Sequence, residues 1–116
     1  MKTAELMVAE KSTEKGPIIT AGGELDLTTV GQLRELLLTH AGREQSSRVI
    51  LDLSRVEFID SAGLALLVEA RKRMSVDDRT LYLVINQGKQ PERVLRLVRF
   101  DTIMKLVYSL DDVPSD

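Results

Sequence analysis

Short apolar runs along the chain predict the strands of a sheet. A weak alternation over Ala4–Glu10 and the β-prone run Ile18–Ala21 predict two strands, and the turn signal Gly16–Pro17 indicates a hairpin between them. Val49–Leu53 and Leu81–Ile85 are nearly continuous apolar runs, typical of strands that are covered on at least one face. The chain therefore contains strand signals both before and after its centre.

Apolar residues at spacings of three and four predict three helices. Thr29 and Gln32 have the spacing of a capping box, and Gly42 supplies a stop, so the first helix is expected between them. A second helix is expected over about Ala62–Met74, and Pro91 indicates the first turn of a third. The expected apolar faces comprise Val30, Leu33, Leu36, Leu37 and Ala41 in the first helix, Gly63, Leu66, Leu67, Ala70 and Met74 in the second, and Val94, Leu97 and Val98 in the third.

The order of these elements favours an α/β fold. Ser54–Glu57 is predicted to turn the chain, Phe58–Ile59 to return it to the core, and a last short strand is expected near Lys105–Tyr108. The resulting order, β-β-α-β-α-β-α-β, favours parallel strands joined by right-handed crossovers, and the opening hairpin makes the sheet mixed. The 116 residues fit a single domain over positions 1–116 with helices packed on its sheet.

Composition narrows the class of protein. Apolar residues make up 43% and charged residues 29%, the profile of a globular protein, and the absence of cysteine excludes disulfides and thiolate metal sites. No apolar run approaches the roughly 20 residues of a membrane helix, and the first residues lack the apolar region of a signal peptide. We therefore expect a cytoplasmic protein without a membrane partner. The net charge of −2 argues against direct nucleic-acid binding.

Candidate chemistry centres on the segment Asp60–Leu64. Asp60 and Ser61 before an apolar run are typical of a helix N-cap, and Gly63 most simply permits close packing of helix and sheet. Free N–H groups at a helix N-terminus favour an anion, so a phosphate on Ser61 is expected to be tolerated. His40 is the only histidine, and the chain has no phosphate-binding loop, so no cofactor and no catalytic site are expected.

Three segments together resemble the STAS-domain anti-sigma-factor antagonists. They are Gly23–Asp26, Val49–Leu53 and Phe58–Leu64, and they occur in the order typical of that family. The resemblance implies that the unphosphorylated protein binds an anti-sigma factor that is also a serine kinase, and so releases a sigma factor. It also implies that the kinase phosphorylates Ser61, that binding is then lost, and that a PP2C-type phosphatase resets the protein. The implied partner-binding residues are Asp26, Asp60, Ser61, Ala62, Gly63 and Leu64.

Some residues depart from the family pattern or leave alternatives open. Ala62 stands where many members carry a second hydroxyl residue, so Ser61 is the only acceptor in the motif. Eight residues follow Tyr108, so the C-terminal helix of the family is expected to be short or absent. Asp26 is as well explained by a turn cap as by a functional role, and Leu64 and Val68 are candidates for an apolar patch beside Ser61.

Two other functions remain open on the sequence. The first is an accessory subunit of a transporter ATPase complex, since STAS-like domains also serve there. The second is a small enzyme or nucleotide-binding protein, for which the sequence offers little support. The stripe Arg93, Arg96 and Arg99 is most simply a solvated face, and otherwise a dock for an acidic partner or nucleotide.

Overall fold

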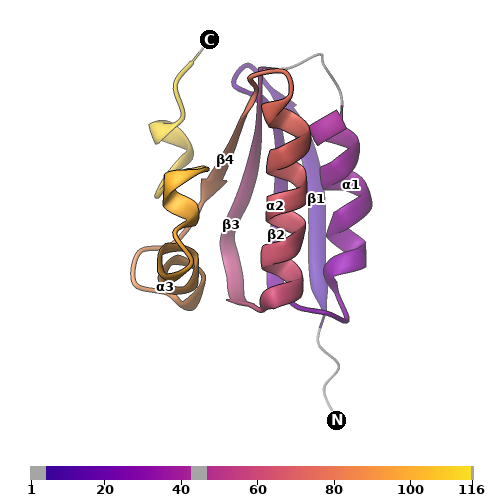
Figure 1. Cartoon of the computed structure of the whole chain (residues 1–116), viewed down its shortest axis with the longest axis vertical. Helices are drawn as coiled ribbons and strands as arrows, with labels where there is room; N and C mark the ends of the chain where they lie inside the picture. The colour runs from indigo at the N-terminus through magenta and orange to yellow at the C-terminus, as the bar shows by residue number, and fades with distance from the viewer. Residues whose placement is uncertain (1–4, 43–46, 116) are drawn as a thin grey trace.

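The computed structural model describes residues 5–42 and 47–115, which form one mixed sheet with helices packed on it (Figure 1). The five strands lie in the order β1-β2-β3-β4-β5, with β1 antiparallel to β2 and each later pair parallel. The elements are β1 Leu6–Thr13, β2 Gly16–Leu25, α1 Val30–Gly42, β3 Arg48–Ile59, α2 Ser61–Ser75, β4 Thr80–Val84, α3 Gln90–Leu97 and β5 Lys105–Val107, with single 3₁₀ turns at Phe100–Thr102 and Leu110–Asp112. The predicted mixed α/β sheet with its N-terminal hairpin is confirmed; Ala4, where the first strand was expected to begin, lies outside the described residues.

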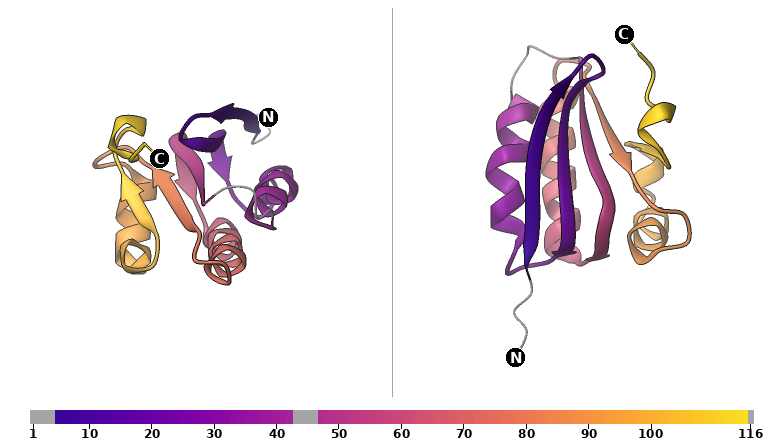
Figure 2. Two further views of the ribbon diagram at one scale, coloured as in Figure 1. Left: turned by 90° about the horizontal axis from the view of Figure 1, so that it is seen from above. Right: turned by 180° about the vertical axis from the view of Figure 1, so that it is seen from behind.

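The three helices cover one face of the sheet, as the view from above shows (Figure 2). The main core lies between them and the sheet and is aliphatic, with Leu37 of α1, Leu67 of α2 and Leu95 of α3 fully buried. A smaller cluster lies on the opposite face, where Leu110 and Val113 of the C-terminal segment pack over the sheet. Between β5 and residue 115, the described chain forms one 3₁₀ turn, Leu110–Asp112. Among the described residues, no helix is long and apolar enough to cross a membrane.

The turn predicted at Ser54–Glu57 is wrong, because β3 continues without interruption to Ile59. Two register irregularities in the pairing of β2 with β3 absorb the additional residues, and Val56, paired with Gly23, remains buried. Since successive side chains of a strand point to opposite faces, Ile59 enters the core while Phe58 is exposed. Because β3 extends to Ile59, the chain reaches the carboxyl end of the strand before α2 begins at Ser61.

The apolar face predicted for α3 is confirmed at Val94, which packs against the main core, and is wrong at Leu97 and Val98. Leu97 is 81% exposed and Val98 is exposed as well, whereas Pro91, Glu92 and Leu95 are the buried residues. The helix has only eight residues, so its few apolar positions fit two different faces. Glu92 is buried because its carboxylate accepts hydrogen bonds from the Gly88 N–H, Arg96 and the Tyr108 hydroxyl, so polar partners fix the orientation of this helix.

Candidate functional site

The loops that follow β2, β3 and β4 meet at one edge of the sheet, where the carboxyl ends of parallel strands lie together. The Asp60 N–H donates to the Leu25 carbonyl at 3.1 Å, which joins the ends of β2 and β3. The side chain of Gln90 forms hydrogen bonds with both backbone polar groups of Ile59. Its Oε1 accepts from the Ile59 N–H and its Nε2 donates to the Ile59 carbonyl, both at 2.9 Å. The start of α3 is thereby attached to the residue that precedes Asp60.

Ser61 is the first residue of α2, and its side chain is exposed at this edge. Within the described ranges, no group is hydrogen-bonded to the Ser61 hydroxyl. An enzyme that modifies this oxygen therefore needs to displace no internal contact. Ala62 and Leu64, the neighbours implied by the family resemblance, are half-buried, and Gly63 is buried.

Asp60 is the N-cap of α2 and at the same time a link to the loop after β2. Its Oδ1 accepts hydrogen bonds from the N–H groups of Ala62 at 2.9 Å and Gly63 at 3.2 Å. Its Oδ2 accepts from the N–H of Leu27 at 3.1 Å. Two of the N–H groups that were expected to be free for a phosphate, those of Ala62 and Gly63, are thus already occupied, and a phosphate on the exposed Ser61 would not need them to stay at the surface.

Gly63 is required for the close approach of α2 to the sheet. A Cβ atom at this position would lie 2.9 Å from Ile59 Cγ2, 2.9 Å from Leu25 Cγ and 3.1 Å from the Leu25 carbonyl oxygen. These atoms belong to the ends of β2 and β3, so a larger residue would push the first turn of α2 away from them. Gly63 therefore positions Ser61 by packing, as the sequence indicated, and presents no side chain to a partner.

Asp26 shapes the loop between β2 and α1. Its Oδ1 accepts from the Thr28 hydroxyl at 2.8 Å and from the Thr28 and Thr29 N–H groups, and these bonds, that of the Thr28 hydroxyl first, hold the pKa of Asp26 below its usual range. The predicted capping box is wrong, because the buried Thr29 hydroxyl donates to the Glu24 carbonyl at 2.7 Å and accepts from the Asp26 N–H. Asp26 thus orders the start of this loop, next to Leu27, whose N–H donates to Asp60.

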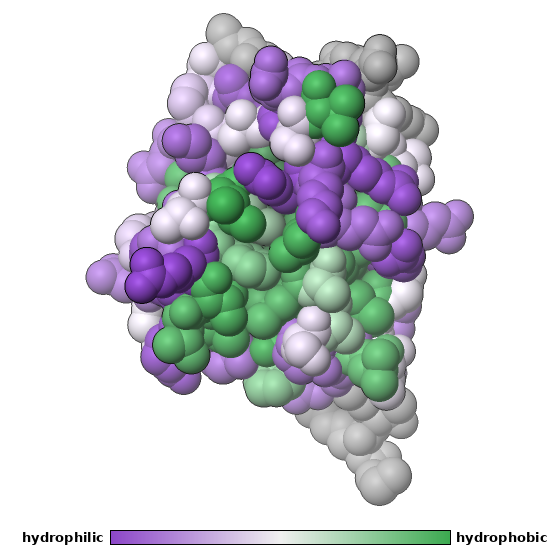
Figure 3. Space-filling view, viewed as in Figure 1, coloured by the Kyte–Doolittle hydropathy of each residue, from purple (hydrophilic) through white to green (hydrophobic). Residues whose placement is uncertain are grey.

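Leu27 is the site residue that sequence reasoning missed. It is 77% exposed, although its N–H is held by Asp60 next to Ser61. Figure 3 shows further apolar surface across the lower half of the helical face. Among the apolar residues of α2 and α3, Leu64 and Val68 are half-buried and Leu97 is exposed. The only sequence signal for Leu27 was an apolar residue in an otherwise polar loop, between Asp26 and Thr28.

In the part of the chain that the structure describes, no group of three or more His, Cys, Asp or Glu residues could hold a metal ion. The clefts of about 410, 320 and 270 Å³ that indent the surface are lined by residues other than Asp60 and Ser61. The arrangement is a displayed hydroxyl with apolar and acidic neighbours, suited to contact with another protein.

The family model and the relatives that match this chain agree on one family. The family model described as the STAS domain matches residues 8–113. An anti-sigma-B factor antagonist of Staphylococcus epidermidis is 36% identical over 66 residues, which cover 57% of this chain and 60% of that protein. The match thus spans less than two thirds of that relative's length.

Solved structures show the same fold. The crystal structure of an anti-sigma factor antagonist from Mycobacterium paratuberculosis superposes with a TM-score of 0.83 at 21% identity, covering 93% of this chain and 90% of that one. The Bacillus cell fate determinant SpoIIAA in its phosphorylated form gives a TM-score of 0.65 at 19% identity, covering 90% and 95% of the two chains.

Proposed function

The chain belongs to the STAS domain family, and on that premise we propose that it is an anti-sigma-factor antagonist, a binding protein rather than an enzyme. Its partner is an anti-sigma factor, and binding releases the sigma factor that this partner holds. We take residues 1–116 as one domain that works in the cytoplasm. The observation that carries the proposal is the exposed Ser61 at the start of α2, within the segment that resembles the family motif.

The anti-sigma factor is also a serine kinase that phosphorylates Ser61. The Ser61 oxygen forms a bond to the γ-phosphorus of ATP, the bond between that phosphorus and the β,γ-bridging oxygen breaks, ADP leaves, and the hydroxyl proton passes to a base of the kinase. A PP2C-type phosphatase later hydrolyses the phosphate. The free hydroxyl of Ser61 supports its role as acceptor, and SpoIIAA, which shares the fold, has a structure in a phosphorylated form.

Phosphorylation acts through charge at a surface that otherwise stays in place. A phosphate adds about −1.5 to −2 charges at neutral pH, next to the carboxylate of Asp60. Because Asp60 already binds the N–H groups of Ala62 and Gly63, the phosphate is not drawn into its own helix. Burying it against a partner costs several kcal/mol, and each 1.4 kcal/mol is a factor of ten in affinity. One phosphate therefore suffices to abolish binding.

The apolar neighbours of Ser61 supply the affinity of the unphosphorylated form. Leu27 projects from the loop after β2, and Leu64 and Val68 follow along α2. Exposed apolar groups beside a polar target are typical of the centre of a protein interface. Asp26 and Asp60 order this surface through the bonds described above, so they contribute to binding by position.

The proposal is tested by incubating the protein with a candidate anti-sigma kinase and ATP and measuring its intact mass. We expect one phosphate on the wild-type protein and none on Ser61→Ala. Ser75→Ala is the matched control, because Ser75 is an exposed serine at the other end of the same helix. Equal labelling of Ser61→Ala and wild type would contradict the assignment of the site.

A further inference from the structure

The two edges of the sheet differ in how they are protected. β5 has three residues, and the chain that follows it packs back over the sheet. β1 has eight residues, pairs with β2 without a register shift, and forms the free margin of the sheet (Figure 2). Edge strands expose unpaired N–H and C=O groups, and proteins protect them by short length, bulges, proline, charged side chains or a covering helix or loop. β1 is not short, bulged or interrupted by proline, and its charged residues are Lys11 and Glu10, which pairs with His40 of α1.

Pro17 determines which backbone groups of β1 point outward. It is the partner of Ser12, and because proline has no N–H this pair cannot exchange two hydrogen bonds. Bonded and non-bonded pairs alternate along an antiparallel ladder, so the odd-numbered residues of β1 bond to β2. The even-numbered residues direct their N–H and C=O groups to the open edge; these are Leu6, Val8, Glu10 and Ser12.

The side chains of β1 match a second, antiparallel copy of the same strand. With a two-fold axis at Val8, Glu5 lies opposite Lys11 of the second copy and Met7 lies opposite Ala9, each pair occurring twice. Glu5 and Lys11 are exposed, and Met7 is 69% exposed, so these groups are available. Opposite charges and apolar side chains that face each other across strands stabilise a sheet.

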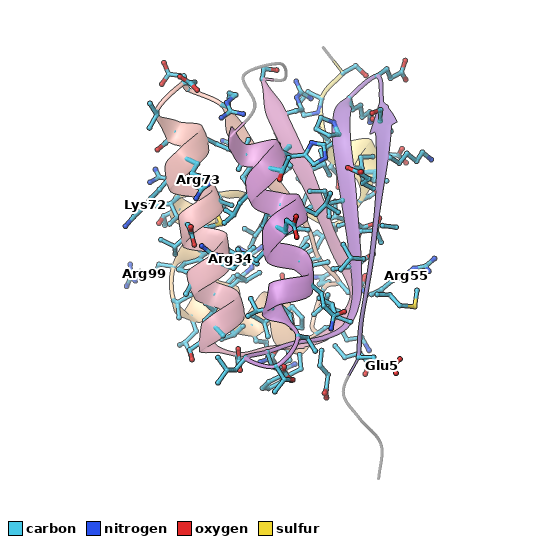
Figure 4. The ribbon with its side chains drawn as sticks, turned by 90° about the vertical axis from the view of Figure 1, so that its right-hand side faces the viewer. Glu5, Arg34, Arg55, Lys72, Arg73 and Arg99 are labelled. Carbon is cyan, nitrogen blue, oxygen red and sulfur yellow. The ribbon has the colours of Figure 1, made fainter. Side chains whose placement is uncertain are left out.

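Other registers match less well. An axis at Glu10 would place two carboxylates opposite each other, and an axis at Ala9 would set Met7 against Lys11. Figure 4 shows Glu5 at the lower end of β1, away from α2. Of these three registers, only the one centred on Val8 sets opposite charges, Glu5 and Lys11, against each other, and it also places Leu6 opposite Glu10.

We propose that two copies of this chain associate through β1, in antiparallel pairing about a two-fold axis at Val8, and so join their two five-stranded sheets. An axis perpendicular to the sheet keeps the helices of both copies on the same face. Ser61 lies at the carboxyl edge of the parallel strands and not along β1, so the dimer presents two Ser61 sites and covers neither. The inference does not depend on the proposed function.

The test uses charge reversal with sedimentation equilibrium across micromolar to millimolar concentrations. The wild-type protein is expected to dimerise, and Glu5→Lys and Lys11→Glu are each expected to weaken the dimer about tenfold or more, since each reversal sets like charges opposite each other twice. Mixing the two variants restores the dimer, because every reversed charge then faces an opposite one. Lys72→Glu, a reversal on the helical face, leaves the dimer unchanged (Figure 4).

A backbone variant tests the same contact independently of charge. Val8→Pro removes an outward N–H without touching an odd-numbered residue that bonds to β2, and circular dichroism establishes that the variant is folded. A folded Val8→Pro that dimerises as wild type does would overturn the proposal. So would a wild-type protein that stays monomeric at every concentration, or charge variants that fail to restore a dimer on mixing.

Discussion

Asp60 accepts a hydrogen bond from the backbone N–H of Leu27, with 3.1 Å between Oδ2 and N, and so connects the loop after β2 to the first turn of α2. The other carboxylate oxygen caps α2, so one side chain holds both segments that flank Ser61. The relative position of an apolar side chain, Leu27, and a hydroxyl, Ser61, is therefore fixed by a single carboxylate.

Asp60→Asn separates these two roles. The amide oxygen of asparagine caps a helix as well as aspartate does, but its NH₂ group cannot accept the Leu27 N–H. We expect faster hydrogen exchange at the Leu27 amide, with the amides of Ala62 and Gly63 still protected. Glu57→Gln, an exposed neutralisation on β3, is the control. An unchanged exchange rate at Leu27 would show that the link to Asp60 does not order the loop.

Gly63→Ala should destabilise the fold although alanine is the better helix former. The added Cβ would meet Leu25 and Ile59 at 2.9 Å, and overpacking of this kind costs about 1–3 kcal/mol. Gly31→Ala in α1 is the matched control, because a Cβ there has nothing within 4 Å and should stabilise the fold by about 0.5–1 kcal/mol. Urea unfolding measures both, and a Gly63→Ala protein more stable than wild type would refute the close packing.

Leu27→Ser should weaken binding to the anti-sigma factor without changing stability. The side chain is 77% exposed, so the free energy of unfolding should change by less than about 0.5 kcal/mol. Loss of an apolar anchor at an interface costs about 1–2 kcal/mol, roughly tenfold in affinity. Val76→Ser is matched, since Val76 is 82% exposed at the far end of α2. Equal affinities of the two variants would remove Leu27 from the interface.

The stability of the protein should fall in acid through Glu92. Hydrogen bonds from the Gly88 N–H and then the Tyr108 hydroxyl lower the pKa of this carboxyl from 4.5 to about 2. Because the unfolded chain binds the proton more readily, this contribution is fully present above pH 4.5 and is lost as the pH falls toward 2. Unfolding measured against pH should show a smaller acid loss in Tyr108→Phe, which removes one of the hydrogen bonds that lower the pKa of Glu92. An identical pH profile would exclude Tyr108 as a cause.

The sequence predicted those parts of the fold that local periodicity encodes. Val49–Leu53 and Leu81–Ile85 are buried strands as expected, because continuous apolar runs need cover. The extension of β3 was missed, since the polar residues Ser54–Glu57 resemble a turn unless their pairing with β2 is known. In α3, the apolar residues fit two faces, and the buried Glu92 that decides between them depends on Tyr108, sixteen positions away.

In the candidate site too, local features could be predicted from the sequence and long-range contacts could not. Ser61 and its cap could be predicted because the motif is contiguous in the chain. The contact between Asp60 and Leu27 spans 33 positions and follows only from the parallel pairing of β2 with β3. The prediction of free N–H groups at the start of α2 is wrong for Ala62 and Gly63, because the carboxylate of the cap residue Asp60 accepts from both.

The affinity of one anti-sigma factor for the unphosphorylated and the stoichiometrically phosphorylated protein, measured by calorimetry, tests the central claim most directly. The account predicts that the phosphate on Ser61 weakens binding by about a hundredfold or more, since several kcal/mol of like-charge and desolvation cost must be overcome. Circular dichroism of the two forms should be the same, because the phosphate stays at the surface. Equal affinities for the two forms would contradict the account.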